Sequence, residues 1–136
     1  MIVSKLPIRS IEDERGKLGV VEFECDLPFE VKRVYYLTDL GKSEPRGFHA
    51  HKELYQVAMC ITGSCKMLLD TGFDKQWVHM NSKDSEGILI QPMVWHEMHN
   101  FSDDCVFLVY ASDVYRESDY IRSYSDFLSN LSEEKN

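Results

Sequence analysis

The sequence lacks a long hydrophobic run and is poor in basic residues. No apolar stretch approaches the roughly 20 residues that cross a bilayer, and the first residues have no extended hydrophobic region of the signal-peptide kind. We therefore expect no membrane partner and predict a cytoplasmic protein. Lys and Arg total 15 against 23 Asp and Glu, so the net charge is −8. Because nonspecific nucleic-acid binders present a basic face, a nucleic-acid polymer is not an expected partner.

Cysteine pairs and linkers are also missing. The four cysteines stand singly in apolar, strand-like runs with no C-x-x-C spacing, which excludes a zinc knuckle and a thioredoxin-type motif. Free cysteine is usually buried, so we expect buried thiols. There is no low-complexity segment and no internal repeat. A chain of 136 residues suits one domain, and we predict a single domain over residues 1–136.

Short strand patterns fill most of the chain, separated by Gly, Pro, Asn and Asp, which predicts an all-β sandwich or barrel, here a double-sheet roll. Residues 55–61 and 65–69 flank Thr62-Gly63-Ser64, so we expect these two runs to pair as a hairpin. Apolar residues then recur at helical spacing, which predicts a C-terminal helix over about 118–131 with Ser118 as its cap. The expected strands cover residues 18–23, 31–37, 55–61, 65–69, 77–80, 87–91 and 105–111.

The segment RGFHAH at residues 46–51 is the centre of chemical interest. Alternation along a strand sends His49 and His51 to the same face, toward whatever the barrel encloses. Two histidines in one cavity can bind a metal, move protons or fill a polar core. A neutral imidazole, with a pKa of roughly 6.5, is well suited to taking a proton from a carbon beside a carbonyl.

Residues around this pair match the two cupin motifs. Gln56 and Gly63 follow the H-x-H pair in the register of the first motif. The second motif is matched in order by Gly87, Pro92, His96 and Asn100, with Val94 in place of its usual glycine. The chain thus resembles the cupins.

One departure from the cupin pattern bears on metal binding. Metal cupins place a Glu where this chain has Gln56, and a neutral amide is a weaker ligand for a divalent ion than a carboxylate. We therefore predict no metal and no cofactor. A site of His49, His51 and His96 remains open as the alternative, with a metal-dependent oxygenase as its activity.

Three arginines stand near glycine turns or the expected cavity, namely Arg15, Arg33 and Arg46. Arginine binds a diphosphate through bidentate contacts, so these residues suit a nucleotide-linked substrate. From their spacing alone, these arginines are equally well explained as solvated charges on the protein surface.

The chain resembles the dTDP-4-keto-6-deoxyglucose 3,4-ketoisomerases, the WxcM-like sugar-nucleotide ketoisomerases of the cupin superfamily, over nearly its whole length. The RGFHAH segment and the segment DYIRSY at 119–124 are the most distinctive matches. The other matching stretches lie at residues 13–16, 28–36, 63–64, 95, 101–102 and 108–115.

This resemblance implies a cupin double-stranded β-helix, or jelly roll, and a metal-free isomerase that moves the carbonyl from C4 to C3 through an enediol. The pathway implied is deoxysugar biosynthesis for O-antigen or another surface polysaccharide. The implied catalytic residues are His51 as the base and His49 as its partner in proton transfer. Arg46 and Tyr35 are the expected donors to the enolate oxygen, since a developing oxyanion needs a donor or cation.

The implied substrate-binding residues are Arg15, Arg33, Gly47 and Trp95. Packing in the core is the competing interpretation for Trp95, and His96 is either functional or structural. A homodimer with exchanged N-terminal strands is also implied, so that one of the arginines acts across the interface. The configuration of the product at C4 depends on which face receives the proton.

Two further alternatives stay open. A non-catalytic cupin would bind the dTDP-sugar without exchanging its C3 proton with solvent. An epimerase would begin with the same proton removal and would pair the base with a tyrosine acid, for which Tyr35, Tyr36 and Tyr55 are candidates.

Overall fold

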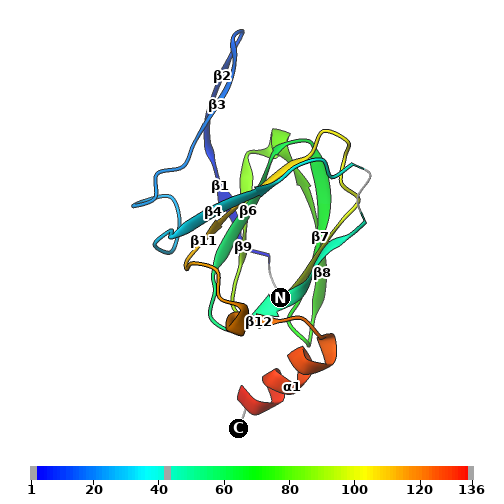
Figure 1. The fold of residues 1–136 in the computed structure, drawn as a ribbon. Coiled ribbons are helices and arrows are strands. Elements are labelled where there is room, and N and C mark those ends of the chain that lie inside the picture. Colours follow the sequence, from blue (N-terminus) through cyan, green and yellow to red (C-terminus); the bar gives the residue numbers. More distant parts are fainter. Residues whose placement is uncertain (1–2, 42–43, 135–136) are drawn as a thin grey trace.

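In the computed structural model, which describes residues 3–41 and 44–134, two five-stranded sheets curve around one core (Figure 1). The first sheet has the order β1 (Lys5–Pro7), β9 (Glu86–Ile90), β6 (Gln56–Thr62), β11 (Val106–Ala111) and β4 (Arg33–Leu37). The second has the order β12 (Tyr120–Ile121), β5 (Arg46–His51), β10 (Trp95–His99), β7 (Ser64–Asp70) and β8 (Lys75–Asn81). The predicted all-β roll with one C-terminal helix is confirmed.

A hairpin, two 3₁₀ turns and one helix complete the fold. They are the hairpin of β2 (Arg9–Asp13) and β3 (Gly16–Val20), the 3₁₀ turns η1 (Ser82–Asp84) and η2 (Glu117–Asp119), and the helix α1 (Tyr124–Glu134). The hairpin projects from one end of the roll, and α1 lies at the other end (Figure 1). Within the described ranges, no helix is long and apolar enough to cross a membrane.

The core lies between the two sheets because strands of both turn alternate residues inward. On β11, Phe107, Val109 and Ala111 are at most 1% exposed, whereas the intervening residues are partly exposed. Met67 and Leu69 of β7 meet them from the second sheet. This period of two is what a strand buried on one face requires.

Three of the four cysteines are buried as predicted, but the prediction is wrong for Cys25. Cys60, Cys65 and Cys105 belong to the core, whereas Cys25 is exposed. The apolar run that suggested a strand as far as residue 23 stops at β3, and the chain then turns, with the Cys25 amide donating to the Glu22 carbonyl. Cys25 therefore lies in a surface turn.

The predicted hairpin over 55–69 is wrong. β6 pairs with β9 and β11 in the first sheet, whereas β7 pairs with β8 and β10 in the second. Between them Gly63 has a φ of 74°, which a residue with a side chain rarely adopts. The chain uses this turn to cross from one sheet to the other, so two consecutive apolar runs face each other across the core.

The C-terminal helix begins later than predicted. Residues 117–121 form η2 and β12, in which Ile121 pairs with Ala50 of β5 and is 4% exposed. The helix cap is Ser123, whose hydroxyl accepts from the Asp126 amide at 3.3 Å, and Ser118 is not the cap. The backbone groups of residues 120 and 121 pair with β5 at the edge of the second sheet. A helix that began at residue 118 would prevent this pairing.

Candidate active site

Three imidazoles meet inside the roll. His49 and His51 stand on β5, and His96 on the neighbouring β10 pairs directly with His49. The ring centroid of His49 lies 4.5 Å from that of His96 and 5.0 Å from that of His51. His51 and His96 are 2% and 3% exposed. The prediction that the H-x-H pair shares a face is confirmed, and His96 joins it.

Each imidazole is held through its Nδ1 atom. His49 Nδ1 lies 3.0 Å from the Gly47 carbonyl oxygen, and His96 Nδ1 lies 3.1 Å from that of Val94. His51 Nδ1 lies 3.1 Å from Oδ2 of Asp119. Because all three neighbours are acceptors, each Nδ1 carries the proton, and each Nε2 keeps its lone pair.

Burial keeps these rings neutral. It lowers the pKa of His49, His51 and His96 from the ordinary value. At His51, the neighbouring His49 and the cations Arg33 and Arg122 lower the pKa further. The carboxylate of Asp119 lies directly beside Nδ1 of His51. His51 is therefore a neutral base whose conjugate acid has a counter-ion beside it.

Asp119 is a site residue that sequence reasoning missed. It comes from η2, 68 positions along the chain from His51, and its other oxygen accepts the Glu53 amide at 2.8 Å. The Lys52 amide donates to the Asp119 carbonyl at 3.0 Å. These bonds tie η2 to the loop after β5. The available signal was the acid that opens the distinctive DYIRSY segment, but no local pattern links it to a histidine so distant.

Tyr120 is the second missed residue. Its ring centroid lies 4.3 Å from that of His51 and 5.1 Å from that of His49. The guanidinium of Arg122 sits 4.2 Å from the Tyr120 ring centroid. The short strand β12 thus gives the histidines both an aromatic wall and a nearby cation.

Tyr35 and Gln56 form a buried pair. The Tyr35 hydroxyl donates to Gln56 Oε1 at 2.6 Å, and Gln56 is 1% exposed. Burial raises the pKa of the Tyr35 phenol, so it stays protonated. The residue that stands where metal cupins have a glutamate therefore accepts a hydrogen bond from a phenol.

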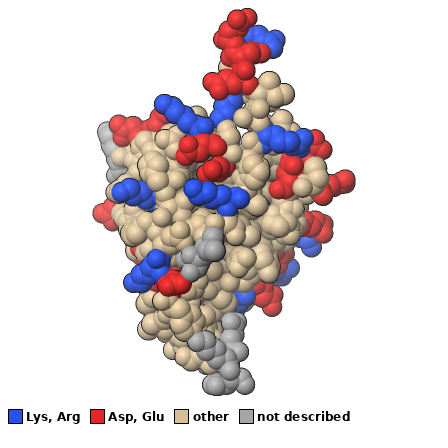
Figure 2. All heavy atoms as spheres, turned by 180° about the vertical axis from the view of Figure 1, so that it is seen from behind, with Lys and Arg blue, Asp and Glu red and all other residues tan. Residues whose placement is uncertain are grey.

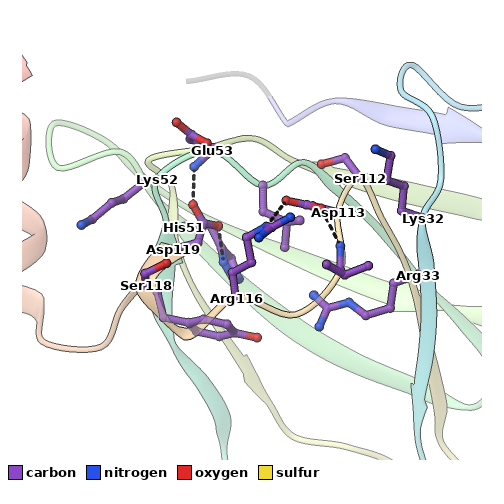
Figure 3. Close-up of a pocket in the computed structure, with 13 residues that line it drawn as sticks. Lys32, Arg33, His51, Lys52, Glu53, Ser112, Asp113, Arg116, Ser118 and Asp119 are labelled. Carbon is purple, nitrogen blue, oxygen red and sulfur yellow. Dashed lines mark hydrogen bonds and ion pairs between the residues drawn. The ribbon is translucent and has the colours of Figure 1, made fainter.

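A pocket of about 540 Å³ opens over His51 and Asp119, within the usual range for small-molecule sites. Figure 3 shows the His51–Asp119 pair beside Arg116, with Lys32 and Arg33 across the pocket. Arg116 is paired with Asp113, whereas the buried Nε of Arg33 has no hydrogen-bond partner among the described residues. The pocket combines a base at its floor with cations on its wall, which suits an anionic substrate.

Four other predicted residues lie elsewhere in this chain. Arg46 is exposed at the start of β5, and Gly47, with a φ of 93°, supplies the carbonyl that holds His49. Trp95 is 4% exposed and packs against the Phe127 ring of α1. Arg15 lies between β2 and β3 at the tip of the hairpin, which projects from the roll (Figure 1). The described residues that line the pocket include none of these four, and neither His49 nor Tyr35; of the predicted site residues they include His51 and Arg33.

Comparison with known proteins places this geometry in a family. The model of the family FdtA, described as WxcM-like, C-terminal, matches residues 2–132. The chain is 50% identical over 119 residues to the TDP-4-oxo-6-deoxy-alpha-D-glucose-3,4-oxoisomerase of Aneurinibacillus thermoaerophilus, covering 88% of this chain and 85% of that protein.

Two solved structures agree with this match. One is a histidine-to-asparagine mutant of the 3,4-ketoisomerase QdtA from Thermoanaerobacterium thermosaccharolyticum in complex with TDP-4-keto-6-deoxyglucose, with 39% identity, a TM-score of 0.91 and coverage of 96% of this chain and 94% of that one. A 3,4-ketoisomerase from Helicobacter canadensis matches at 40% identity and a TM-score of 0.90, over 97% and 98% of the two chains.

Proposed function

This chain belongs to the WxcM-like, C-terminal family, and on that premise we propose that His51 is the base of its isomerisation reaction. The chain is a dTDP-sugar 3,4-ketoisomerase of deoxysugar biosynthesis, like the oxoisomerase to which it is 50% identical over 119 residues. One observation carries the assignment of the base. His51 Nε2 is buried, has no hydrogen-bond partner in the described part of the chain, and belongs to a ring fixed by Asp119 at the floor of the pocket.

The proposed reaction moves two protons. Nε2 of His51 takes the proton from C3 of the 4-keto sugar, and the C3 electron pair forms the C3=C4 bond of an enediolate with the negative charge on O4. The proton of O3 then passes to O4, the C3 carbonyl forms, and C4 receives a proton from the imidazolium. Asp119 stabilises that imidazolium, as a carboxylate behind a histidine does in other proton-transfer sites.

His49 is our candidate for the transfer between the oxygens. Its Nε2 is free to accept a proton because Gly47 holds its Nδ1, and its ring lies beside that of His51. Tyr35 as donor to the enolate oxygen stays a prediction from the sequence, because its single hydroxyl proton is donated to Gln56 Oε1 and that bond would have to break first. The roles of Arg46 and Trp95 stay predictions from the family resemblance. Neither residue lines the pocket of this chain, so the structure adds no support for those roles.

Arg33 is our proposed anchor for the diphosphate. Its side chain lines the pocket together with Lys32 and Arg116, and its buried Nε has no hydrogen-bond partner among the described residues. A dianion there would gain several donors at once. Its guanidinium lies 5.3 Å from the Tyr35 ring centroid, which keeps it close to the catalytic residues.

We propose a homodimer to account for Arg15. The β2–β3 hairpin carries the exposed apolar residues Ile11 and Leu18 at 66% and 58% exposure, and charged side chains gather at its projecting end (Figure 2). A groove of about 280 Å³ beside the hairpin, lined in part by Met59 and Tyr110, offers apolar surface for a second copy. In such a dimer, Arg15 would reach the site of the other chain.

Mixed dimers test this arrangement. Neither Arg15→Ala nor His51→Asn should isomerise substrate alone. If Arg15 acts across the interface, co-expression of the two variants creates one complete site in each heterodimer and restores activity. If the mixture stays inactive, Arg15 does not serve the partner's site.

The activity itself is tested by NMR with chelator-treated protein and dTDP-4-keto-6-deoxyglucose in D₂O. We expect a 3-keto product with deuterium at C4, and the coupling at C4 then gives its configuration. Binding without deuterium exchange would instead support the non-catalytic cupin. The cytoplasm and a surface polysaccharide remain our predictions for the compartment and the end product.

A further inference from the structure

The proposed reaction needs a hydrogen-bond donor close to His51. Removal of the C3 proton places a negative charge on O4, and a developing oxyanion is best stabilised by a donor that is already in position. We propose that the hydroxyl of Tyr120 is this donor, which makes Tyr120 a catalytic residue of the isomerase. This inference rests on the proposed function, and the experiments below separate the failure of one from the failure of the other.

Tyr120 stands directly opposite the base. It begins β12, and it pairs with His51 in the antiparallel register of β12 and β5. Residues that face each other in such a pair turn their side chains to the same side of the sheet. The Tyr120 ring centroid accordingly lies 4.3 Å from that of His51 and 5.1 Å from that of His49. Because O4 is two bonds from C3, its donor must lie beside the base, and Tyr120 meets this requirement.

The Tyr120 hydroxyl is available to a substrate. Tyr120 is half-buried and lines the pocket, and no hydrogen bond joins its hydroxyl to another residue in the described part of the chain. The Tyr35 hydroxyl, by contrast, donates to Gln56 Oε1 at 2.6 Å. A phenol has a single proton to donate. Tyr120 can therefore serve O4 without breaking a bond inside the protein, whereas Tyr35 cannot.

Two further side chains hold the Tyr120 ring in place. The guanidinium of Arg122 lies 4.2 Å from the ring centroid, within the range of a cation–π contact. Both carboxylate oxygens of Glu117 fix that guanidinium, since Oε1 accepts from Nε of Arg122 at 2.8 Å and Oε2 accepts from Nη2 at 2.9 Å. A donor held in this way needs little reorganisation when charge develops on the substrate.

Tyr120 keeps its proton throughout the proposed reaction. Nε2 of His51 takes the C3 proton, the electron pair forms the C3=C4 bond, and O4 becomes the oxyanion that the Tyr120 hydroxyl binds. The proton of O3 then neutralises O4, so the phenol gains and loses nothing. A hydrogen bond to an oxyanion is stronger than one to a neutral carbonyl, so this contact stabilises the transition state more than the bound substrate.

The kinetic test compares Tyr120→Phe with the wild type in the NMR assay of isomerisation. Phenylalanine keeps the ring beside both histidines and removes only the hydroxyl. We expect kcat to fall about 100-fold or more, the usual cost of losing one oxyanion donor, with an unchanged affinity for TDP. Tyr36→Phe is the matched control, since Tyr36 is 67% exposed on β4 and does not line the pocket, and it should react like the wild type. Full activity in Tyr120→Phe would overturn the donor and leave the isomerase standing.

A binding test decides the contact without turnover. Calorimetry compares TDP-4-keto-6-deoxyglucose with TDP in His51→Asn and in the double variant that adds Tyr120→Phe. The loss of a hydrogen bond to the C4 carbonyl should weaken binding of the keto sugar about 5-fold and leave TDP binding unchanged. Equal affinities for the keto sugar, or an equal loss for TDP, would contradict the proposal. If the wild type shows no isomerase activity, the proposed function fails, while this comparison still decides whether Tyr120 contacts the ketone.

Discussion

Oδ2 of Asp119 lies 3.1 Å from Nδ1 of His51, while Oδ1 of the same carboxylate accepts the Glu53 amide at 2.8 Å. One side chain thus orients the base and joins η2 to the loop that follows β5. The pair also gives the imidazolium formed in the reaction a counter-charge that is in place before the substrate arrives.

Asp119→Asn should slow the reaction while leaving substrate binding nearly intact. The amide keeps the shape of the side chain but loses the charge that stabilises protonated His51, so we expect kcat to fall about 100-fold with little change in KM. Steady-state kinetics measure this, with the exposed Asp84→Asn as control. A rise in KM alone would mean that Asp119 serves binding.

Arg33→Ala should instead raise KM while leaving kcat nearly unchanged. Losing a half-buried charge that binds the diphosphate should raise KM about 10-fold or more, with kcat changed only a few-fold. Calorimetry with TDP measures the affinity for the nucleotide without the sugar, and Arg9→Ala on the hairpin is the control. Unaltered TDP affinity in Arg33→Ala would contradict the anchor.

Stability should decline as the solution becomes acidic. Burial lowers the pKa of His96. The imidazole of His96 therefore takes up a proton near pH 6.5 in the unfolded chain, whereas it stays neutral at that pH in the folded chain. The folded state therefore loses stability as pH falls below about 6.5, by about 1 kcal/mol from this residue at pH 5.5.

Urea denaturation at pH 7.5 and 5.5 checks this sign. The loss on acidification should be smaller in His96→Gln than in the wild type, and it should be unchanged in His79→Gln, whose histidine is exposed. Equal losses in all three proteins would contradict a neutral, buried His96.

The sequence predicted the features that depend on the periodicity of apolar residues and on residues that lie close together along the chain. Alternation predicted the sheets and the common face of His49 and His51, since a strand fixes side-chain direction over two residues. It did not predict which strands pair. Residues 62–64 predict a hairpin turn, whereas the chain crosses there from one sheet to the other, with Gly63 at a positive φ.

The site was predicted less completely because its contacts are long-range. Asp119 ends η2 and Tyr120 begins β12, and both contact His51 from a stretch whose spacing favoured helix. Trp95 and Arg46 flank the histidines in the chain, but neighbours along a strand point to opposite faces, so proximity in sequence did not bring them into the pocket.

The most direct test of the central claim is the exchange of the C3 proton of dTDP-4-keto-6-deoxyglucose in D₂O, followed by NMR for the wild type, His51→Asn and His79→Asn. If His51 is the base, His51→Asn binds TDP normally but loses exchange by at least about 100-fold, and His79→Asn exchanges like the wild type. Exchange at C3 that survives in His51→Asn would contradict the account and move the base to another residue.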